Sequence, residues 1–212
     1  MSYTNLLRRG CLSWLITWMA ASTAFAMPPI RVLALGDSLT AGYGLNSNAS
    51  FPAQLEARLK EQGLVVEVFN AGVSGDTSAG ALARLEWSLA DNPDVVILAI
   101  GANDALRGLD PSQTRSNLQK MLGLLQDSES QVVFAGMRAP RNLGQTYYTN
   151  FDRIYPELAQ QFNVHFYPFF LEGVAAEPAL NLPDGIHPNE TGISRIVDGI
   201  LPLVIEAIQQ AL

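Results

Sequence analysis

Residues 95–100 read VVILAI, an uninterrupted apolar run rich in β-branched side chains. A short run of this kind predicts a strand that is buried on both of its faces. Similar runs at residues 31–35, 65–69 and 131–135, and a weaker one at residues 164–167, predict four more strands.

Segments with helical periodicity lie between these runs. Apolar side chains recur every three or four residues within 51–59, 82–89, 118–125 and 151–162, and a last pattern extends from about Thr191 to the C-terminus. Ser50 and the pair Asp110-Pro111 are typical of helix starts, whereas Pro202 is expected to kink or split the last helix. Because strands and helices alternate, the sequence predicts an α/β fold with helices on both faces of a mainly parallel, five-stranded sheet. Ligands of such sheets bind beyond the carboxyl ends of the strands.

The first 26 residues are predicted to be a secretory signal peptide. Arg8 and Arg9 precede an apolar run at residues 11–20, and the small residues that follow end in AFA at 24–26. A basic start, a short apolar middle and an A-x-A end are typical of such signals, and the run is too short for a comfortable membrane anchor. The expected organisation is therefore a signal peptide at 1–26 and one folded domain at 27–212, exported to the periplasm or secreted. The alternative is a retained N-terminal helix.

Net charge and cysteine content exclude some binding partners and some kinds of chemistry. The full chain carries a net charge of −7, which becomes −9 without the signal peptide because Arg8 and Arg9 are its only charged residues. An acidic surface repels nucleic acid and anionic membranes, so we expect neither as a partner. The only cysteine, Cys11, lies in the predicted signal peptide, so we expect no disulfide or thiol chemistry in the mature protein.

A candidate nucleophile follows the first predicted strand. Residues 36–39 read GDSL. A serine on a tight turn between a strand and a helix projects from the edge of the sheet, where a substrate reaches it. The motif differs from the G-x-S-x-G elbow because position 40 is a threonine. Taken alone, Ser38 is equally compatible with a simple helix cap.

Groups suited to an oxyanion hole follow the next two strands. Gly72, in the sequence NAG at residues 70–72, would let a substrate oxygen approach a backbone N–H with no side chain in the way. Asn103, in the sequence GAND at residues 101–104, offers a side-chain amide. Ordinary turn chemistry is the alternative for each residue. Three successive strand ends nevertheless bring three parts of one site to the same edge of the sheet.

A candidate acid–base pair precedes the last helix, in the sequence DGIHP at residues 184–188. Three residues apart in a glycine-containing turn, the Asp184 carboxylate can fold back onto the His187 ring and fix its tautomer. The other histidine, His165, lies in a strand-like run and is interpreted as structural. If Ser38 has a base, His187 is therefore the candidate. A capping aspartate and a surface histidine are the alternative interpretation.

Together these motifs resemble the blocks of the GDSL, or SGNH, hydrolase family. GDSL at residues 36–39, Gly72, GAND at 101–104 and DGIH at 184–187 occur in the order of that family, and the resemblance covers essentially the whole chain after the signal peptide. It is closest to the bacterial periplasmic arylesterases and multifunctional acyl thioesterase/lysophospholipases. The stretches IYPEL at 154–158 and YPFF at 167–170 also resemble that branch.

The resemblance implies a flavodoxin-like, three-layer α/β/α sandwich and a serine esterase that needs no metal or other cofactor. Ser38 would be the nucleophile, His187 the base, and Asp184 the residue that orients the base. The N–H groups of Ser38 and Gly72 and the side-chain amide of Asn103 would form the oxyanion hole. The implied substrates are small molecules: aryl esters, acyl thioesters or lysophospholipids. A carbohydrate O-deacetylase is the alternative within the family.

A long segment opens on the same edge, from Met137 to about Tyr148. It is longer than most connections between a strand and a helix, and such segments are often functional. The family branch has a substrate-contacting loop at this place, which implies that the acyl chain is bound by residues Arg141, Asn142, Leu143 and Gly144. An ordinary surface loop is the alternative.

The residues alone are also compatible with two functions other than that of a serine esterase. Asp37, Asp104 and Asp184 could be the carboxylate ligands of a metal-dependent phosphoesterase, although no H-x-H or D-x-D pair supplies closely spaced ligands. A non-catalytic binding protein of the same fold is the other alternative. Binding alone, however, would not need a serine, a histidine and an aspartate together.

Overall fold

The computed structural model describes residues 28–212, so the predicted signal peptide at 1–26 lies outside the described residues. Five parallel strands form one sheet in the order β2-β1-β3-β4-β5. The strands are β1 (Ile30–Gly36), β2 (Val66–Gly72), β3 (Val95–Ala99), β4 (Gln131–Ala135) and β5 (His165–Tyr167). β3 is the middle strand and all five of its side chains are buried, as its apolar sequence predicts.

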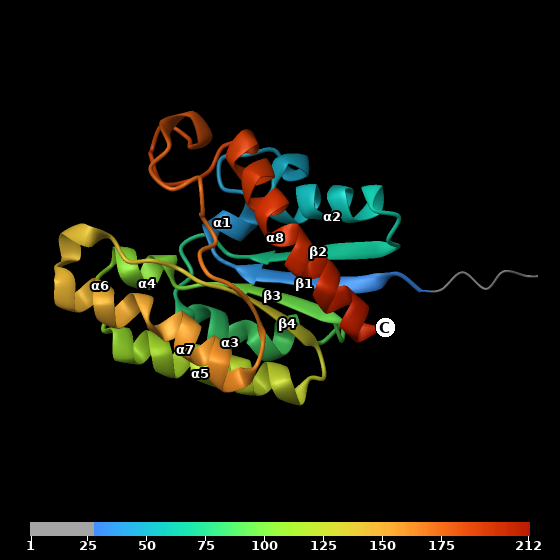
Figure 1. Cartoon of the computed structure of the whole chain (residues 1–212), viewed down its shortest axis with the longest axis horizontal. Coiled ribbons are helices and arrows are strands. Elements are labelled where there is room, and N and C mark those ends of the chain that lie inside the picture. The colour runs from blue at the N-terminus through green and yellow to red at the C-terminus, as the bar shows by residue number, and fades with distance from the viewer. Residues whose placement is uncertain (1–27) are drawn as a thin grey trace, which may run out of the picture.

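Helices cover both faces of the sheet (Figure 1). α2 and α8 pack against each other on one face, and α3, α5 and α7 lie on the other. The longer helices are α2 (Phe51–Glu61), α3 (Ser78–Ser88), α5 (Pro111–Asp127), α6 (Gln145–Asp152), α7 (Ile154–Phe162) and α8 (Glu190–Ala211). The short helices are α1 (Ser38–Ala41) and α4 (Ala102–Leu106), with 3₁₀ turns at Ser47–Ala49, Arg141–Leu143 and Pro178–Leu180. The predicted three-layer α/β/α fold is therefore confirmed.

The last helix, α8, is continuous, so of the two effects predicted for Pro202, a kink or a split, the split does not occur. Pro202 lies on the exposed side of α8, where the backbone carbonyl that loses its N–H partner still reaches water. The opposite side of α8 is fully buried against the sheet and α2, and it consists of residues Ile193, Ile196, Val197, Ile200, Val204 and Ile208. Burial of residues before and after Pro202 stabilises the continuous helix.

The single helix predicted around residues 151–162 is two helices, α6 and α7, which meet at Arg153. Pro156 explains the break, because it has no N–H to donate to the carbonyl of Asp152. Since α6 begins at Gln145 and a 3₁₀ turn spans Arg141–Leu143, the segment from Met137 to Tyr148 is less of an irregular loop than the sequence suggests.

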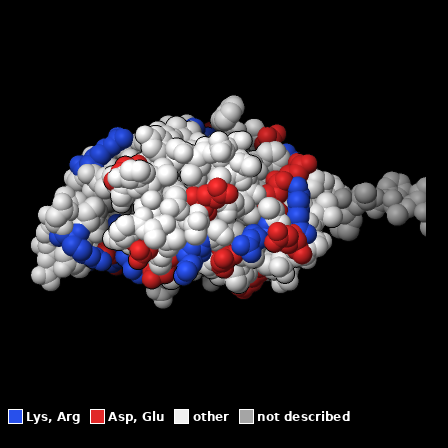
Figure 2. All heavy atoms as spheres, turned by 90° about the horizontal axis from the view of Figure 1, so that it is seen from above, with Lys and Arg blue, Asp and Glu red and all other residues white. Residues whose placement is uncertain are grey.

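Acidic and basic side chains are interspersed on the face shown in Figure 2. One of the surface ion pairs joins two helices, with Arg58 Nη2 of α2 lying 3.2 Å from Asp198 Oδ1 of α8. Among the helices of residues 28–212, none combines the length and the apolar character that crossing a bilayer requires.

Candidate active site

Ser38 lies at the start of α1, immediately after the carboxyl end of β1. The preceding residue, Asp37, caps this helix, since its Oδ1 accepts the Leu39 N–H at 3.0 Å. Gly36 makes the tight turn possible, because a Cβ at this position would overlap the Thr40 hydroxyl and the carbonyl of Ala99 on β3. The strand end and the cap together aim the Ser38 side chain beyond the edge of the sheet.

The structure brings His187 to Ser38 although 149 residues separate them: His187 Nε2 is 2.9 Å from Ser38 Oγ. The other ring nitrogen, Nδ1, is 2.7 Å from Asp184 Oδ2. The second carboxylate oxygen, Asp184 Oδ1, accepts the backbone N–H groups of Ile186 and His187 at 2.9 and 3.0 Å. The Asp184 carboxylate therefore holds both the turn and the imidazole ring in place. Serine, imidazole and carboxylate follow one another in the order that a catalytic triad requires.

Hydrogen bonds keep the Asp184 carboxylate ionised. The backbone N–H groups of His187 and Ile186, and then the His187 ring, lower the pKa of Asp184 from 3.8 to about 2. The residue is thus negatively charged across the neutral range. A fixed negative charge at Nδ1 favours the tautomer that carries its proton there and leaves Nε2 free to accept one.

Asn103 lies in α4, after the carboxyl end of β3. The preceding Gly101 adopts a positive φ of 116°, where a side chain would also overlap the Tyr155 hydroxyl. The Asn103 amide donates to the carbonyl of Asp76 at 2.9 Å and to Asp37 Oδ2 at 3.3 Å. The longer bond links the amide to the residue next to Ser38, so the amide points towards the nucleophile.

The structure does not bring Gly72 to this site, which corrects the sequence prediction. β2 continues to Gly72, three residues further than the apolar pattern indicates, so Gly72 still pairs in register with Gly36. Its N–H donates to Asn70 Oδ1 at 2.9 Å, and it lines a separate cavity of about 520 Å³ beside Arg84 and Trp87. A Cβ at Gly72 would overlap the Ala41 backbone, so close packing of α1 explains the glycine.

The turn that contacts Asn103 is formed by residues 73–76, directly after Gly72. Its glycine, Gly75, was not predicted from the sequence as part of the site. The Asp76 N–H donates to the carbonyl of Val73 at 3.0 Å, and Gly75 inside the turn has a φ of +84°. The Asp76 carbonyl accepts the Asn103 amide, and no acceptor within residues 28–212 takes the Gly75 N–H. A glycine before a turn-forming aspartate, in SGD at 74–76, was the available signal.

An apolar cavity of about 730 Å³ opens beside Ser38, Asn103 and His187. Its walls include the side chains of Leu106, Met137, Phe169, Leu171 and Ile186. Mostly apolar walls with a few polar groups are typical of a site for a small molecule.

Only part of the predicted substrate segment reaches this cavity. Arg141 lines it, whereas Asn142, Leu143 and Gly144 are not among its lining residues. Arg141 is held by an ion pair with Asp152 at 2.8 Å and lies over the Tyr148 ring, 4.3 Å from its centroid. Since α6 supplies both of these partners, the Arg141 side chain is anchored to a helix rather than to a free loop.

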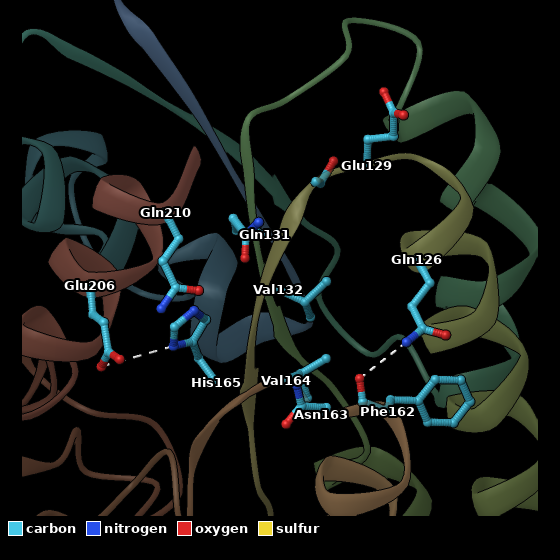
Figure 3. A pocket seen from close by; sticks show the side chains of 11 residues that line it. Gln126, Glu129, Gln131, Val132, Phe162, Asn163, Val164, His165, Glu206 and Gln210 are labelled. Carbon is cyan, nitrogen blue, oxygen red and sulfur yellow. Dashed lines mark hydrogen bonds and ion pairs between the residues drawn. The ribbon is translucent and has the colours of Figure 1, made fainter. Parts of the chain in front are cut away.

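The second histidine, His165, lies at the amino ends of the strands, whereas Ser38 lies at their carboxyl ends. His165 begins β5, and it lines a polar cavity of about 460 Å³ at the amino ends of β4 and β5 (Figure 3). Its Nδ1 is 3.9 Å from Glu206 Oε2, and Ser130, which lines the same cavity, donates its hydroxyl to the carbonyl of Pro93 instead. This cavity therefore holds no serine–histidine pair.

The other aspartates that could have formed a metal site have separate partners. Asp104 is buried and accepts the Ser78 N–H at 2.8 Å and the Thr114 hydroxyl at 3.1 Å. Asp37 bonds to Leu39 and Asn103, and Asp184 to His187. Residues 28–212 contain no group of three His, Cys, Asp or Glu side chains arranged to hold a metal ion.

Asp37 is expected to make stability depend on pH. Burial of the carboxyl group is the main cause that raises the pKa of Asp37 from 3.8 to about 6, although the hydrogen bonds from Leu39 and Asn103 lower it. The folded protein thus binds this proton more tightly than the unfolded chain, so this residue's contribution to stability is present below pH 4 and is lost as pH rises to about 6. The full difference corresponds to about 3 kcal/mol.

Chemical unfolding of the wild type and of Asp37→Asn at pH 4 and pH 7 measures this contribution. We expect the wild type to lose more free energy of unfolding than the variant between the two values. Glu67→Gln, on the exposed side of β2, is the control. Equal losses in wild type and Asp37→Asn would contradict the assignment.

Comparison with known proteins agrees with the fold and identifies the family. Residues 34–194 match the model of the GDSL-like Lipase/Acylhydrolase family. The chain is 45% identical to an arylesterase of Vibrio mimicus, over 74% of this chain and 80% of that protein. It is 40% identical to the thioesterase 1/protease 1/lysophospholipase L1 of Escherichia coli, over 79% of each. The crystal structure of TesA superposes with a TM-score of 0.80 and 37% identity, over 84% of this chain and 99% of that one.

Proposed function

Because the chain belongs to the GDSL-like Lipase/Acylhydrolase family and is a carboxylic ester hydrolase, we propose that it cleaves esters and thioesters through an acyl-enzyme on Ser38. The observation that carries this proposal is the pair of contacts at His187, 2.9 Å to Ser38 Oγ and 2.7 Å to Asp184 Oδ2. A ring held between a hydroxyl and a carboxylate is poised to take the hydroxyl proton.

Acylation begins when His187 Nε2 removes the Ser38 proton and Oγ attacks the substrate carbonyl carbon. The carbonyl π electrons move to the oxygen and form a tetrahedral oxyanion. When this intermediate collapses, the bond to the leaving group breaks, and the alcohol or thiol departs with the proton from Nε2. Water then attacks the acyl-enzyme with His187 as base, which releases the acid and restores Ser38.

Three donors are proposed for the oxyanion: the Ser38 N–H, the Asn103 amide and the Gly75 N–H. The Asp76 carbonyl next to Gly75 accepts the Asn103 amide at 2.9 Å, which supports Gly75 in place of Gly72. The Asn103 amide also donates at 3.3 Å to Asp37, and we propose that the oxyanion replaces this longer bond. Donors that are already in place need little reorganisation as the charge develops.

Replacement of Asn103 by alanine should lower kcat by about 10²–10³-fold, as expected for the loss of one oxyanion donor. The measurement is steady-state hydrolysis of p-nitrophenyl butyrate by the wild type and by Asn103→Ala. Asn142→Ala, whose amide does not line the cavity, is the matched control and should stay within twofold of the wild type. Near-normal turnover of a folded Asn103→Ala variant would show that the assignment is wrong.

The apolar cavity supports a substrate with a hydrocarbon acyl chain. Leu106, Met137 and Phe169 offer no hydrogen bonds to a sugar, so the lining favours acyl esters, acyl thioesters or lysophospholipids over acetylated carbohydrates. Arg138 and Arg141 lie at the cavity, but Glu172 and Asp152 pair with them at 3.5 and 2.8 Å. We therefore propose that apolar contact, more than charge, selects the substrate.

A substrate panel tests this function against its rivals. The purified protein should hydrolyse p-nitrophenyl esters and acyl thioesters, with a higher kcat/KM for medium acyl chains than for acetate, and with full activity after treatment with EDTA. A preference for acetylated xylose would support the O-deacetylase alternative. Activity lost to the chelator would support the phosphoesterase alternative, and no hydrolysis at all would support the binding protein.

We also propose that residues 1–26 direct export to the periplasm. The basic start and the A-x-A end at residues 24–26 support this assignment. Mass spectrometry of the protein from a periplasmic fraction should give an N-terminus at Met27. A protein that retains residues 1–26 and stays with the cytoplasmic fraction would contradict the proposal.

A further inference from the structure

Tyr43 is an exposed aromatic residue that lies against the His187 ring. Its ring centroid is 4.4 Å from that of His187, with an angle of 33° between the planes, although 52% of Tyr43 is exposed. Tyr43 is outside the GDSL motif and does not line the 730 Å³ cavity. An exposed tyrosine in contact with the imidazole therefore needs an explanation other than the core or the acyl-chain site.

The backbone fixes Tyr43 relative to the nucleophile. Gly42, with a φ of 83°, ends α1, and the N–H groups of Gly42 and Tyr43 both donate to the Ser38 carbonyl at 3.2 Å. Leu45 closes the turn by donating to the carbonyl of Gly42 at 3.0 Å. The turn that carries the tyrosine ring is thus bonded directly to the residue whose hydroxyl reacts.

The same turn also packs on the segment that carries His187. A Cβ at Gly44, which has a φ of +73°, would overlap the side chain of Leu182. Leu182 in turn donates its N–H to the carbonyl of His187 at 2.7 Å. The turn at residues 42–45 and the segment at residues 182–187 are therefore in contact at two points, Gly44 with Leu182 and Tyr43 with His187.

The hydrogen bonds of His187 leave the faces of its ring unrestrained. The bonds to Asp184 and Ser38 lie at the two ring nitrogens and fix where each nitrogen points. Contact with an aromatic face opposes tilting of the imidazole out of this plane. An aromatic face also attracts a cation, so the contact strengthens when the ring becomes an imidazolium during proton transfer.

We propose that Tyr43 is a positioning residue that supports His187 through ring contact and favours the charged ring in the transition state. This inference rests on the proposed role of His187 as the base. An interaction that is stronger in the transition state than in the substrate complex raises kcat without lowering KM. The tyrosine ring, and not its hydroxyl, carries the effect.

Kinetics of three variants at this position test the proposal with p-nitrophenyl butyrate. Tyr43→Ala and Tyr43→Leu remove the aromatic ring, and the leucine keeps apolar bulk if the alanine variant folds poorly. Both should lower kcat by about three- to tenfold, with KM within twofold of the wild type. Tyr43→Phe keeps the ring and should stay within twofold in both constants. Trp87→Ala, at an exposed aromatic residue far along α3, is the control for surface changes.

The rate of Ser38 labelling by a fluorophosphonate gives an independent readout, because labelling also needs the serine proton to be removed. It should fall in parallel with kcat in the alanine and leucine variants. Wild-type kcat in both variants, an equal loss in Tyr43→Phe, or a change confined to KM would each overturn the proposal. If instead wild-type Ser38 is not labelled at all while esters are hydrolysed, the proposed function itself fails.

Discussion

Replacement of Ser38 by alanine is expected to reduce kcat by about 10⁶-fold. The variant keeps the bound imidazole and the oxyanion donors but has no oxygen to form the acyl-enzyme. Residual hydrolysis should come from attack by water, assisted by the oxyanion donors and by substrate binding. Steady-state kinetics with p-nitrophenyl butyrate, at enzyme concentrations high enough to detect slow turnover, measures the loss.

Two controls make this result specific to the nucleophile. Thermal unfolding of Ser38→Ala should match the wild type, because the Ser38 side chain bonds only to His187 among the described residues. Ser130→Ala, in the polar cavity at the other edge of the sheet, should keep full activity. Hydrolysis by Ser38→Ala at more than a hundredth of the wild-type rate would mean that another group attacks the substrate.

Replacement of Asp184 by asparagine is expected to lower kcat by about 10⁴-fold. The asparagine Oδ1 can still accept the N–H groups of Ile186 and His187, which donate to Asp184 Oδ1 at 2.9 and 3.0 Å, so the turn should persist. Its amide nitrogen, however, would donate towards His187 Nδ1. That contact favours the wrong tautomer, in which Nε2 carries the proton and cannot accept another from Ser38.

The low pKa of Asp184 determines what its titration contributes to the pH dependence of the wild type. Since the pKa of Asp184 is lowered to about 2, its protonation cannot account for a loss of activity between pH 5 and 7 in the wild type. Asp198→Asn, on the exposed side of α8, is the matched control and should keep wild-type kcat. An Asp184→Asn variant with a normal structure and a kcat within tenfold of the wild type would contradict the orienting role.

The sequence predicted the sheet well because its signal is physical and local. Strands buried on both faces must be apolar, and residues 95–99 and 132–135 meet that condition, as the structure confirms. The pairing of Ser38 with His187 is less local, since it depends on the sheet order that brings residues 149 positions apart together. It was nevertheless predicted, because the sequence has only one other histidine and because DGIH at residues 184–187 resembles a block of the family.

Gly72 and Tyr43 mark where prediction from the sequence stops. β2 runs on through Asn70 and Gly72, which have weak strand propensity, so the turn that reaches Asn103 comes later than the apolar pattern indicates. The sequence around Tyr43 does not indicate its role, because an aromatic residue between two glycines is also compatible with an ordinary surface turn. Its contact with His187 arises only from the tertiary packing of two loops.

Covalent labelling with a fluorophosphonate, followed by peptide mapping, tests the central claim most directly. We expect one adduct per chain, on Ser38, with none formed by Ser38→Ala and a much slower reaction in Asp184→Asn. An adduct on a different serine, or full ester hydrolysis by a protein that forms no adduct, would contradict it.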